Sequence, residues 1–345
     1  RQVYKWRYYQ NNKGNWLNFF LKIFKLLPPE LAHTISLNSL NLLNNLNLLG
    51  LFSKQIPKNN NFNFLGMNFK NRLGTAAGLD KNGDFIDSLG KLGFGFLEVG
   101  TVTPIAQKGN SKPRVFRAYE DKAIINRLGF NNKGVDYLIE NLKKRKYKGI
   151  IGVNIGANKS SKGSERINDY LICLEKVHEY ADYITINISS PNTPNLRDFH
   201  EKDQLNDLII SVDNRVKKIN SKIPIFLKIS PDESNEIIDN IIELIEHSSF
   251  SGIIATNTTI VKNNIRNKKL REIQGGLSGK PLMEKSTSKI SYIKSKNKDV
   301  NVIGVGGVMN KQDYQAKINS GASLVQIYTG FIINGPEIVN NILQK

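Results

Sequence analysis

The sequence predicts an α/β fold, a closed (β/α)8 barrel with an N-terminal helical extension. Short runs rich in β-branched residues alternate along the chain with longer helical patterns. These runs are apolar on both faces, which is typical of parallel strands covered by helices. No GxGxxG motif opens a helix. A closed barrel therefore explains eight strand–helix units better than an open doubly wound sheet does.

Eight runs are expected to form the barrel strands. They are 73–78, 95–100, 150–156, 183–189, 225–230, 252–257, 302–307 and 323–329. Helices fit between most of them, for example at 234–247 and 311–321. Residues 101–126 are longer than a usual connection, so we expect a small extra hairpin there, over the barrel mouth. The 345 residues leave room for additions to a barrel of about 250 residues.

The first 50 residues are expected to form an amphipathic helical extension, and residues 51–345 to form the barrel. Segment 16–27 places its aromatic and aliphatic residues largely on one helical face, with lysines elsewhere. Two prolines then introduce a second helix, 30–46. Segment 16–27 is too short and too charged to span a bilayer. Its pattern is typical of a helix at a membrane surface, and a helical pair packed on the side of the barrel is the alternative.

The chain is strongly basic, since 49 Lys and Arg against 30 Asp and Glu give a net charge of +19. An anionic partner would explain this charge, and so would a coding bias toward Asn, Lys and Ile. The basic residues are scattered and not interleaved with aromatic residues, so nucleic acid is not an expected partner. The single cysteine, Cys173, excludes a disulfide framework and is expected to be a buried apolar residue. The four histidines are far apart, so no metal site is expected.

The carboxyl ends of the expected strands carry many Gly, Asn, Thr and Ser residues, and active sites of such barrels lie at that edge. Glycines after the last two strands let backbone amides approach a phosphate. Amide side chains after strands three, four and six suit the edge of a planar heteroaromatic ring. Lys228 on strand five offers a positive charge to a flavin that becomes anionic on reduction. The pattern predicts a site for a phosphorylated planar cofactor and a small polar substrate.

Eight motifs, in a consistent order, resemble those of a known enzyme family. They are AAGLDK (76–81), GTVTP (100–104), INRLGFNNKG (125–134), NISSPNTP (187–194), ATNTT (255–259), GGLSGKPL (275–282), IGVGG (303–307) and GASLVQIYTG (321–330). The set resembles dihydroorotate dehydrogenase, in particular its membrane-associated, quinone-reducing class 2. LLPPELAH (26–33) resembles the start of the class 2 helical extension. The resemblance implies FMN as cofactor, oxidation of dihydroorotate to orotate, a membrane quinone as terminal acceptor, and a role in de novo pyrimidine (UMP) biosynthesis.

By this resemblance Ser190 is the catalytic base. It would remove a proton from C5 of dihydroorotate while a hydride leaves C6 for the flavin. Asn187 and Asn192 would hold the substrate, and Pro191 and Pro194 would stiffen the loop. Class 1 members carry a cysteine at the base position, so Ser190 and the N-terminal helices favour class 2. A class 1-like enzyme with a soluble acceptor is the alternative, and a non-catalytic basic barrel is a second.

The other site residues carry over position by position from the family. The positions matching its FMN contacts are Ala77, Gly78, Lys81, Thr101, Asn154, Asn187, Lys228, Thr256, Gly279, Gly307, Tyr328 and Thr329. The positions matching its substrate contacts are Lys81, Asn126, Arg127, Leu128, Gly129, Phe130, Asn187, Asn192, Asn257 and Thr258. A quinone site is implied at His33, Arg117 and Tyr328.

The resemblance also implies peripheral association with an anionic membrane, on the cytoplasmic face of the inner membrane if the source is bacterial. One position departs from the family pattern. The chain reads NIGANK, with Ala157 where the family usually has a lysine, while Lys159 is retained. This departure puts a peripheral electrostatic contribution in doubt.

Overall fold

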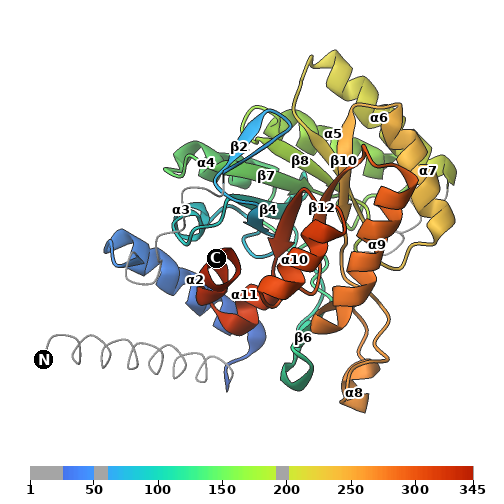
Figure 1. Ribbon diagram of the computed structural model, residues 1–345. Coiled ribbons are helices and arrows are strands. Elements are labelled where there is room, and N and C mark those ends of the chain that lie inside the picture. The colour runs from blue at the N-terminus through green and yellow to red at the C-terminus, as the bar shows by residue number, and fades with distance from the viewer. Residues whose placement is uncertain (1–25, 50–60, 192–201, 345) are drawn as a thin grey trace, which may run out of the picture.

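The computed structural model describes residues 26–49, 61–191 and 202–344 (Figure 1). Its centre is a closed eight-stranded barrel in which all neighbouring strands run parallel. In order around the barrel, the strands are β3 (Leu73–Thr75), β4 (Phe96–Val102), β7 (Ile150–Ile155), β8 (Tyr183–Asn187), β9 (Ile225–Ile229), β10 (Phe250–Ala255), β12 (Asn301–Val305) and β13 (Leu324–Ile327). The predicted fold class and the eight predicted strands are confirmed.

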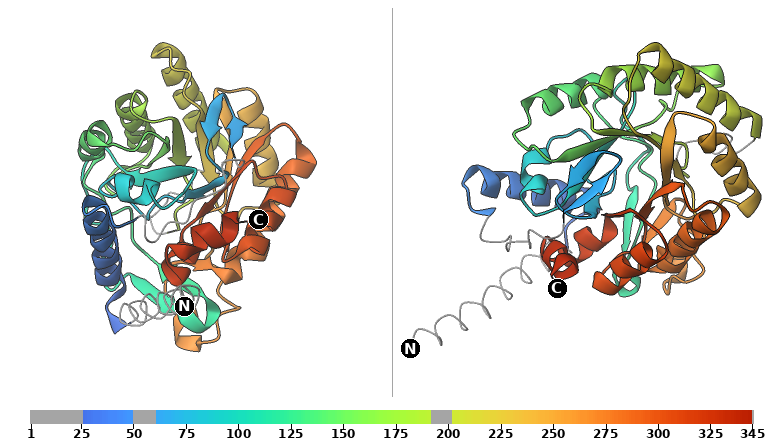
Figure 2. Two further views of the ribbon diagram at one scale, coloured as in Figure 1. Left: turned by 60° about the vertical axis from the view of Figure 1, so that its left-hand side comes forward. Right: turned by 45° about the horizontal axis from the view of Figure 1, so that its top comes forward.

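Helices cover the outside of the barrel in the same order as the strands (Figure 2). They are α3 (Ile86–Gly90), α4 (Val135–Lys144), α5 (Ser164–Val177), α6 (Lys202–Lys218), α7 (Asn235–Glu246), α9 (Met283–Lys296), α10 (Lys311–Asn319), α11 (Thr329–Asn334) and α12 (Glu337–Leu343). Helix α7 shows why they form, because its isoleucines at 238, 241, 242 and 245 give one buried face. Ser234 caps this helix by accepting a hydrogen bond from the Ile237 N–H. Cys173 is buried within α5, as predicted.

Two small sheets lie at opposite ends of the barrel (Figures 1 and 2). The hairpin of β1 (Phe62–Phe64) and β2 (Met67–Phe69) lies at the end where the barrel strands begin. At the mouth, β5 (Val115–Ala118) and β6 (Ala123–Asn126) form the predicted hairpin. The strand β11 (Gly276–Gly279), between β10 and β12, pairs with β6 and was not predicted. The short helix α8 (Lys268–Arg271) precedes it. The mouth sheet thus joins segments about 150 residues apart in the sequence.

Helix α2 (Pro29–Asn45) is the described part of the predicted extension, and it packs on α3 and β5. Arg114 next to β5 holds it through an ion pair with Glu30 at 2.8 Å. Several of its apolar side chains remain exposed, including Leu31, Ile35 and Leu42 at 47%, 37% and 60%. None of the helices that the structure describes has the length and apolar content needed to cross a bilayer. Most of the predicted helix 16–27 lies outside the described residues, and the domain division at residue 50 stays a prediction.

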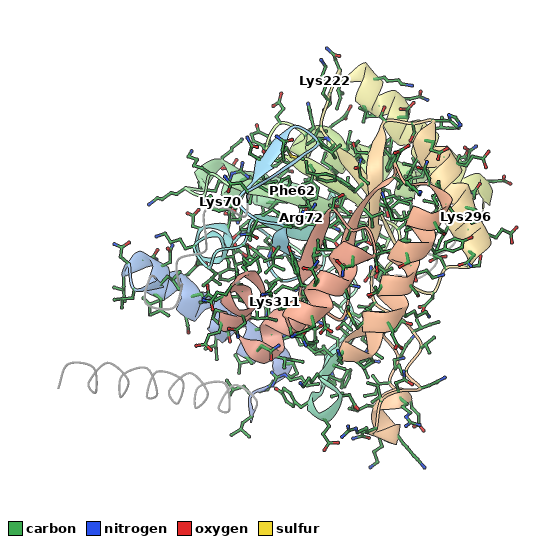
Figure 3. All side chains as sticks on the ribbon, viewed as in Figure 1. Phe62, Lys70, Arg72, Lys222, Lys296 and Lys311 are labelled. Atoms are coloured by element: carbon green, nitrogen blue, oxygen red, sulfur yellow. The ribbon has the colours of Figure 1, made fainter. Side chains whose placement is uncertain are left out.

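Charged side chains point outward from separate places around the barrel (Figure 3). Lys222, Lys296 and Lys311 are exposed examples on different parts of the surface. This distribution agrees with the scattered basic residues of the sequence.

The barrel interior begins with an aromatic layer next to the β1–β2 hairpin. Phe64 and Phe69 of the hairpin contact Phe96 and Phe226 of the barrel, and Tyr183 completes the layer. Phe69–Phe96 and Tyr183–Phe226 pack edge to face, with ring centroids 5.5 Å and 5.7 Å apart. Because inward positions recur every second residue of a strand, the next layer is formed by residues two positions further on.

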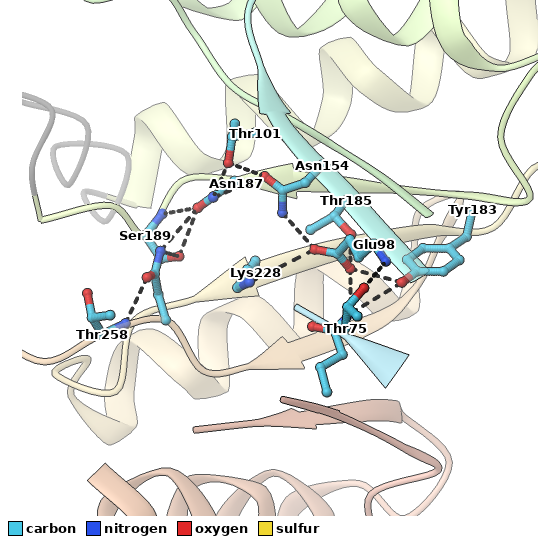
Figure 4. A network of polar contacts seen from close by, with 12 residues as sticks. Thr75, Glu98, Thr101, Asn154, Tyr183, Thr185, Asn187, Ser189, Lys228 and Thr258 are labelled. Atoms are coloured by element: carbon cyan, nitrogen blue, oxygen red, sulfur yellow. Dashed lines mark hydrogen bonds and ion pairs between the residues drawn. The ribbon is translucent and has the colours of Figure 1, made fainter. Parts of the chain in front are cut away.

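That second layer is polar and centres on Glu98, which is fully buried (Figure 4). Its Oε1 accepts a hydrogen bond from Asn154 Nδ2 at 2.9 Å. Its Oε2 accepts three more, from Gln326 Nε2 at 2.6 Å, the Tyr183 hydroxyl at 3.0 Å and the Thr185 hydroxyl at 3.2 Å. One carboxylate thereby links β4 to β7, β8 and β13. The donors compensate the cost of burying its charge.

We expect Glu98→Ala to destabilise the fold by about 3–5 kcal/mol, because it removes the acceptor of the buried Asn154, Tyr183 and Thr185 donors and the counter-charge of Lys228. Urea unfolding would measure this loss. Thr185→Val is the matched control, since it removes one donor and leaves three, and it should cost about 1 kcal/mol. If the free energies of unfolding of the Glu98→Ala and Thr185→Val proteins differed by less than about 1 kcal/mol, the hydrogen bonds to Glu98 would not organise the barrel.

Candidate active site

A cavity lies above the Glu98 layer, where the barrel strands end at their carboxyl termini. Its empty space is about 1010 Å³, counting the part that is open to solvent. The mouth sheet contributes Asn126, Ser278 and Gly279 to its wall. The predicted site residues that line it are Ala77, Gly78, Lys81, Thr101, Asn126, Leu128, Gly129, Phe130, Asn187, Ser190, Lys228, Thr256, Asn257, Thr258, Gly279, Gly307, Tyr328 and Thr329.

Five predicted residues are not placed in the cavity wall. Asn154 is buried directly beneath it. Arg127 donates to the Pro113 carbonyl at 3.0 Å, and Arg117 donates to the Tyr119 hydroxyl at 2.7 Å. His33 lies on α2 outside the lining, and Asn192 lies outside the described residues. The roles predicted for these residues stay predictions.

Ser190 follows β8 directly and is 5% exposed. The preceding turn is held by two amide side chains, one at the end of β8 and one that follows β10. Asn187 Oδ1 accepts hydrogen bonds from the Ser189 N–H at 3.3 Å and from the Ser189 hydroxyl at 3.1 Å. Asn257 Nδ2 donates to the Ser189 hydroxyl at 3.0 Å. With Pro191 next in the chain, these contacts fix the backbone that presents Ser190 to the cavity.

The orientation of the Asn187 amide is itself determined by the polar layer below (Figure 4). Asn154 uses its amide nitrogen on Glu98, so its oxygen faces Thr101 and Asn187. The Thr101 hydroxyl donates to that oxygen at 2.6 Å, and Asn187 Nδ2 donates to it at 3.1 Å. The oxygen of Asn187 is then left to accept from Ser189. A chain of hydrogen bonds therefore runs from Glu98 to the turn that carries Ser190.

Lys228 extends from β9 into the cavity wall and is 5% exposed. Its Nζ lies 3.9 Å from Glu98 Oε1, which is too long for a hydrogen bond. Burial lowers the pKa of the Lys228 ammonium, and the Glu98 carboxylate opposes that shift. No other residue that the structure describes forms a hydrogen bond with this ammonium. Glu98 thus balances the charge of Lys228 while the N–H donors of the ammonium remain available to a ligand.

On the α2 side of the cavity, Lys81 donates to the Gly78 carbonyl at 3.0 Å. Burial lowers the pKa of the Lys81 ammonium to about 8, against the opposing field of Glu30. Burial and the charge of Lys81 lower the pKa of His33 to about 4, so this imidazole is neutral at physiological pH. Burial, with the field of Glu30, raises the pKa of Tyr328 to about 12. His33 is therefore half-buried against the Leu79–Lys81 segment and is not an ordinary surface histidine.

Elsewhere in the cavity wall, Gly306 and Gly307 follow β12 with positive φ angles of 113° and 81°. An added Cβ at Gly307 would collide with the backbone of Met283, the first residue of α9. Only glycine lets this turn lie against the start of the helix, whose N–H groups favour an anion. Two buried oxygens of the lining, Gln326 Oε1 and Thr258 Oγ1, have no hydrogen-bond partner among the residues that the structure describes.

Several residues of this site were not predicted. Glu98, Gln326, Thr185 and Tyr183 form the polar layer, and Ser278 bonds to Thr329 in the wall. Their signal in the sequence is a polar side chain two positions after an aromatic or apolar inward residue, as in FLE (96–98), YIT (183–185) and LVQ (324–326). Ala157, the departure from the family pattern, is buried in the hydrophobic core and does not line the cavity.

The comparisons with known proteins agree with one another. The dihydroorotate dehydrogenase family model matches residues 60–345. The dihydroorotate dehydrogenase (quinone) of Buchnera aphidicola subsp. Schizaphis graminum is 46% identical over 329 residues, covering 94% of this chain and 98% of the relative. That of Saccharophagus degradans is 45% identical over 322 residues, covering 92% and 94%.

Solved structures lead to the same family. DHODH from Eimeria tenella in complex with ferulenol superposes with a TM-score of 0.81 at 33% identity, covering 91% of this chain and 89% of that one. The ligand-free form gives a TM-score of 0.83 with the same identity, covering 91% and 93%. The chain belongs to the dihydroorotate dehydrogenase family.

Proposed function

We propose that this chain oxidises dihydroorotate to orotate, with FMN as hydride acceptor and a membrane quinone as terminal electron acceptor, in pyrimidine biosynthesis. The observation that carries the proposal is the cavity at the barrel mouth. It brings together a buried serine, a lysine whose ammonium faces the cavity, and a glycine turn at a helix start. The curated relatives named dihydroorotate dehydrogenase (quinone) supply the specific reaction.

The residues present fit FMN. Gly306 and Gly307, with the start of α9, would hold its phosphate. Lys228 and the unpartnered Gln326 Oε1 offer a cationic donor and an acceptor in the deep part of the cavity. When bound there, FMN would supply the two-electron chemistry, accepting a hydride from substrate carbon. The protein would contribute binding, orientation and charge.

Ser190 would act as the base toward C5 of dihydroorotate. A hydroxyl is a weak base by itself, so its environment must orient it and exclude water. The Asn187–Ser189–Asn257 contacts orient it, and its 5% exposure excludes most solvent. Lys81 would pair with the substrate carboxylate. Asn126, Asn257 and Thr258 of the wall would form hydrogen bonds with the edge of the pyrimidine ring.

The quinone would approach from the α2 side. Helix α2 lies close to this wall, because Asn41 of α2 donates to the Asp84 carbonyl at 3.1 Å and the charge of Glu30 acts on Lys81 and Tyr328. The exposed leucines of α2 offer an apolar surface to lipid, and the net charge of +19 favours anionic headgroups. We infer peripheral membrane association through this helix. In a bacterium it would be at the cytoplasmic face of the inner membrane.

A steady-state assay with dihydroorotate and three acceptors tests the proposed function. A quinone should sustain turnover, whereas fumarate and NAD should not. Equal or faster turnover with fumarate or NAD would favour a class 1-like enzyme with a soluble acceptor. Absence of turnover with every acceptor in the FMN-loaded protein would contradict the proposal.

Ser190→Ala is expected to keep FMN bound but to slow bleaching of the flavin by dihydroorotate by at least ~10²-fold, as for loss of a positioned base. Higher pH should restore part of the rate because hydroxide replaces the base. Single-turnover absorbance would measure it. Ser189→Ala is the comparison, since that hydroxyl already serves Asn187 and Asn257, and it should lose much less. If Ser189→Ala slowed flavin bleaching more than Ser190→Ala did, Ser190 would not be the base.

Orotate affinity should depend on pH through Lys81. Because the pKa of its ammonium is lowered to about 8, Lys81 is cationic below that pH and becomes neutral above it. The dissociation constant of orotate should rise above pH 8, by up to about tenfold per pH unit. Perturbation of the flavin spectrum would measure it. Lys81→Met should bind weakly with a flat profile between pH 7 and 9. If Lys81→Met kept the pH dependence of orotate binding seen in the wild type, Lys81 would not bind the carboxylate.

His33→Ala should raise the quinone KM and spare the dihydroorotate half-reaction, because His33 lies on α2 outside the cavity wall. Steady-state kinetics with a long-tailed quinone and single-turnover bleaching separate the two effects. Thr34→Ala, an exposed neighbour on the same helix, is the control and should change neither. If His33→Ala had the same quinone KM as Thr34→Ala, His33 would not belong to the quinone site.

A further inference from the structure

Lys317 on α10 is a buried cationic side chain that the proposed mechanism does not use. It is 0% exposed, and its stem packs against Gly304 of β12. Its Nζ donates to the Ser286 hydroxyl at 2.7 Å and to the Thr287 hydroxyl at 3.0 Å. A lysine is almost never fully buried unless something compensates its charge. Two hydroxyls satisfy its donors, but they do not neutralise it.

The two hydroxyls lead directly to the glycine turn that would hold the phosphate. Ser286 Oγ lies within donating distance of the Gly306 carbonyl at 3.0 Å and of the Met283 carbonyl at 3.1 Å. Thr287 Oγ1 donates to the Met283 carbonyl at 2.7 Å. The ammonium is therefore separated from the turn and from the first residue of α9 by one side chain.

The glycine turn is closely packed against α9. An added Cβ at Gly306 would lie 2.8 Å from Ser286 Oγ, and one at Gly307 would collide with Met283. A change in the Lys317–Ser286 contact must therefore move the turn or the start of α9. Gly306, Gly307 and the buried, unpartnered Gln326 Oε1 all line the same cavity, so the turn faces a ligand site.

The charge of Lys317 is only weakly opposed. Asp313, one turn earlier on α10, is the charged group that acts on it. That carboxylate is already engaged by Lys280 Nζ at 3.0 Å and by the Met309 N–H at 2.9 Å. The elements packed against α10, namely α9, α12 and β13, add no further charge to its surroundings among the described residues. Burial lowers the pKa of the Lys317 ammonium to about 7.

We propose that Lys317 is a positioning residue for the phosphate end of the cavity. Through Ser286 and Thr287 it fixes the Gly306–Gly307 turn against α9, and its charge stabilises a phosphate dianion bound there. The proposal rests on FMN as the cofactor and adds a way to select the phosphorylated flavin over one without phosphate. Since a bound dianion favours the ammonium form, binding takes up a proton near neutral pH.

The test compares FMN with riboflavin, which lacks the phosphate, in flavin-depleted protein by fluorescence quenching. Lys317→Met should weaken FMN binding at least tenfold and change riboflavin binding less than twofold. Ser286→Ala, which keeps the ammonium but breaks the link to Gly306, should give an intermediate loss for FMN. Lys294→Met is the control, because Lys294 on α9 bonds to the Val300 carbonyl, away from the glycine turn.

The same titration between pH 7 and 9 measures how the preference for FMN over riboflavin depends on pH. The phosphate stays dianionic over this range, so a change in preference must come from a group of the protein, and a purely structural role of Lys317 would leave the preference constant. Wild-type preference for FMN over riboflavin should fall as pH rises and Lys317 loses its proton, and Lys317→Met should be flat. Equal weakening of both ligands, or of neither, would overturn the proposal. So would a pH-independent preference in the wild type, which needs no variant to fold. A wild-type protein that binds neither flavin would instead refute FMN as the cofactor.

Discussion

The carboxylate of Glu98, buried inside the barrel with four hydrogen-bond donors around it, is the interaction on which the site depends. A charge in that position is tolerated only if its surroundings are complete. The donors come from three other strands, so the strands must keep their register for the carboxylate to be satisfied. The buried aromatic layer lies on one side of Glu98. On the other side lies the cavity, where Glu98 orients Asn154 and, through it, Asn187. The closure of the barrel and the orientation of the turn that carries Ser190 thus depend on one network.

The two ends of the cavity are built on different principles. At the end near β12 and α9, backbone dominates: glycines admit close approach, and a helix start favours an anion. Near α2, titratable side chains dominate: burial shifts the pKa values of His33, Lys81 and Tyr328, and the charge of Glu30 acts on all three. A phosphorylated flavin bound here would have its charged tail at the glycine turn after β12.

Much of this could be predicted from the sequence, because strands buried on both faces leave a strong apolar signal. The Gly, Asn, Thr and Ser residues at the carboxyl ends of the strands indicated the site, and most residues named from the family motifs line the cavity. The polar layer could not be predicted in the same way. Glu98 and Gln326 sit inside strands where an apolar residue is the default, and only three-dimensional closure shows that their partners surround them. The same holds for β11, whose pairing with β6 joins distant segments, and for Lys317, whose burial contradicts its residue type.

We propose that the chain transfers two electrons from dihydroorotate to a flavin held in this cavity. Anaerobic titration of the FMN-loaded protein with dihydroorotate tests it most directly. We predict that one equivalent bleaches the flavin absorption completely, with one equivalent of orotate formed, and that adding a quinone restores the colour. An absorption spectrum unchanged by excess dihydroorotate, in protein that retains FMN, would contradict the account.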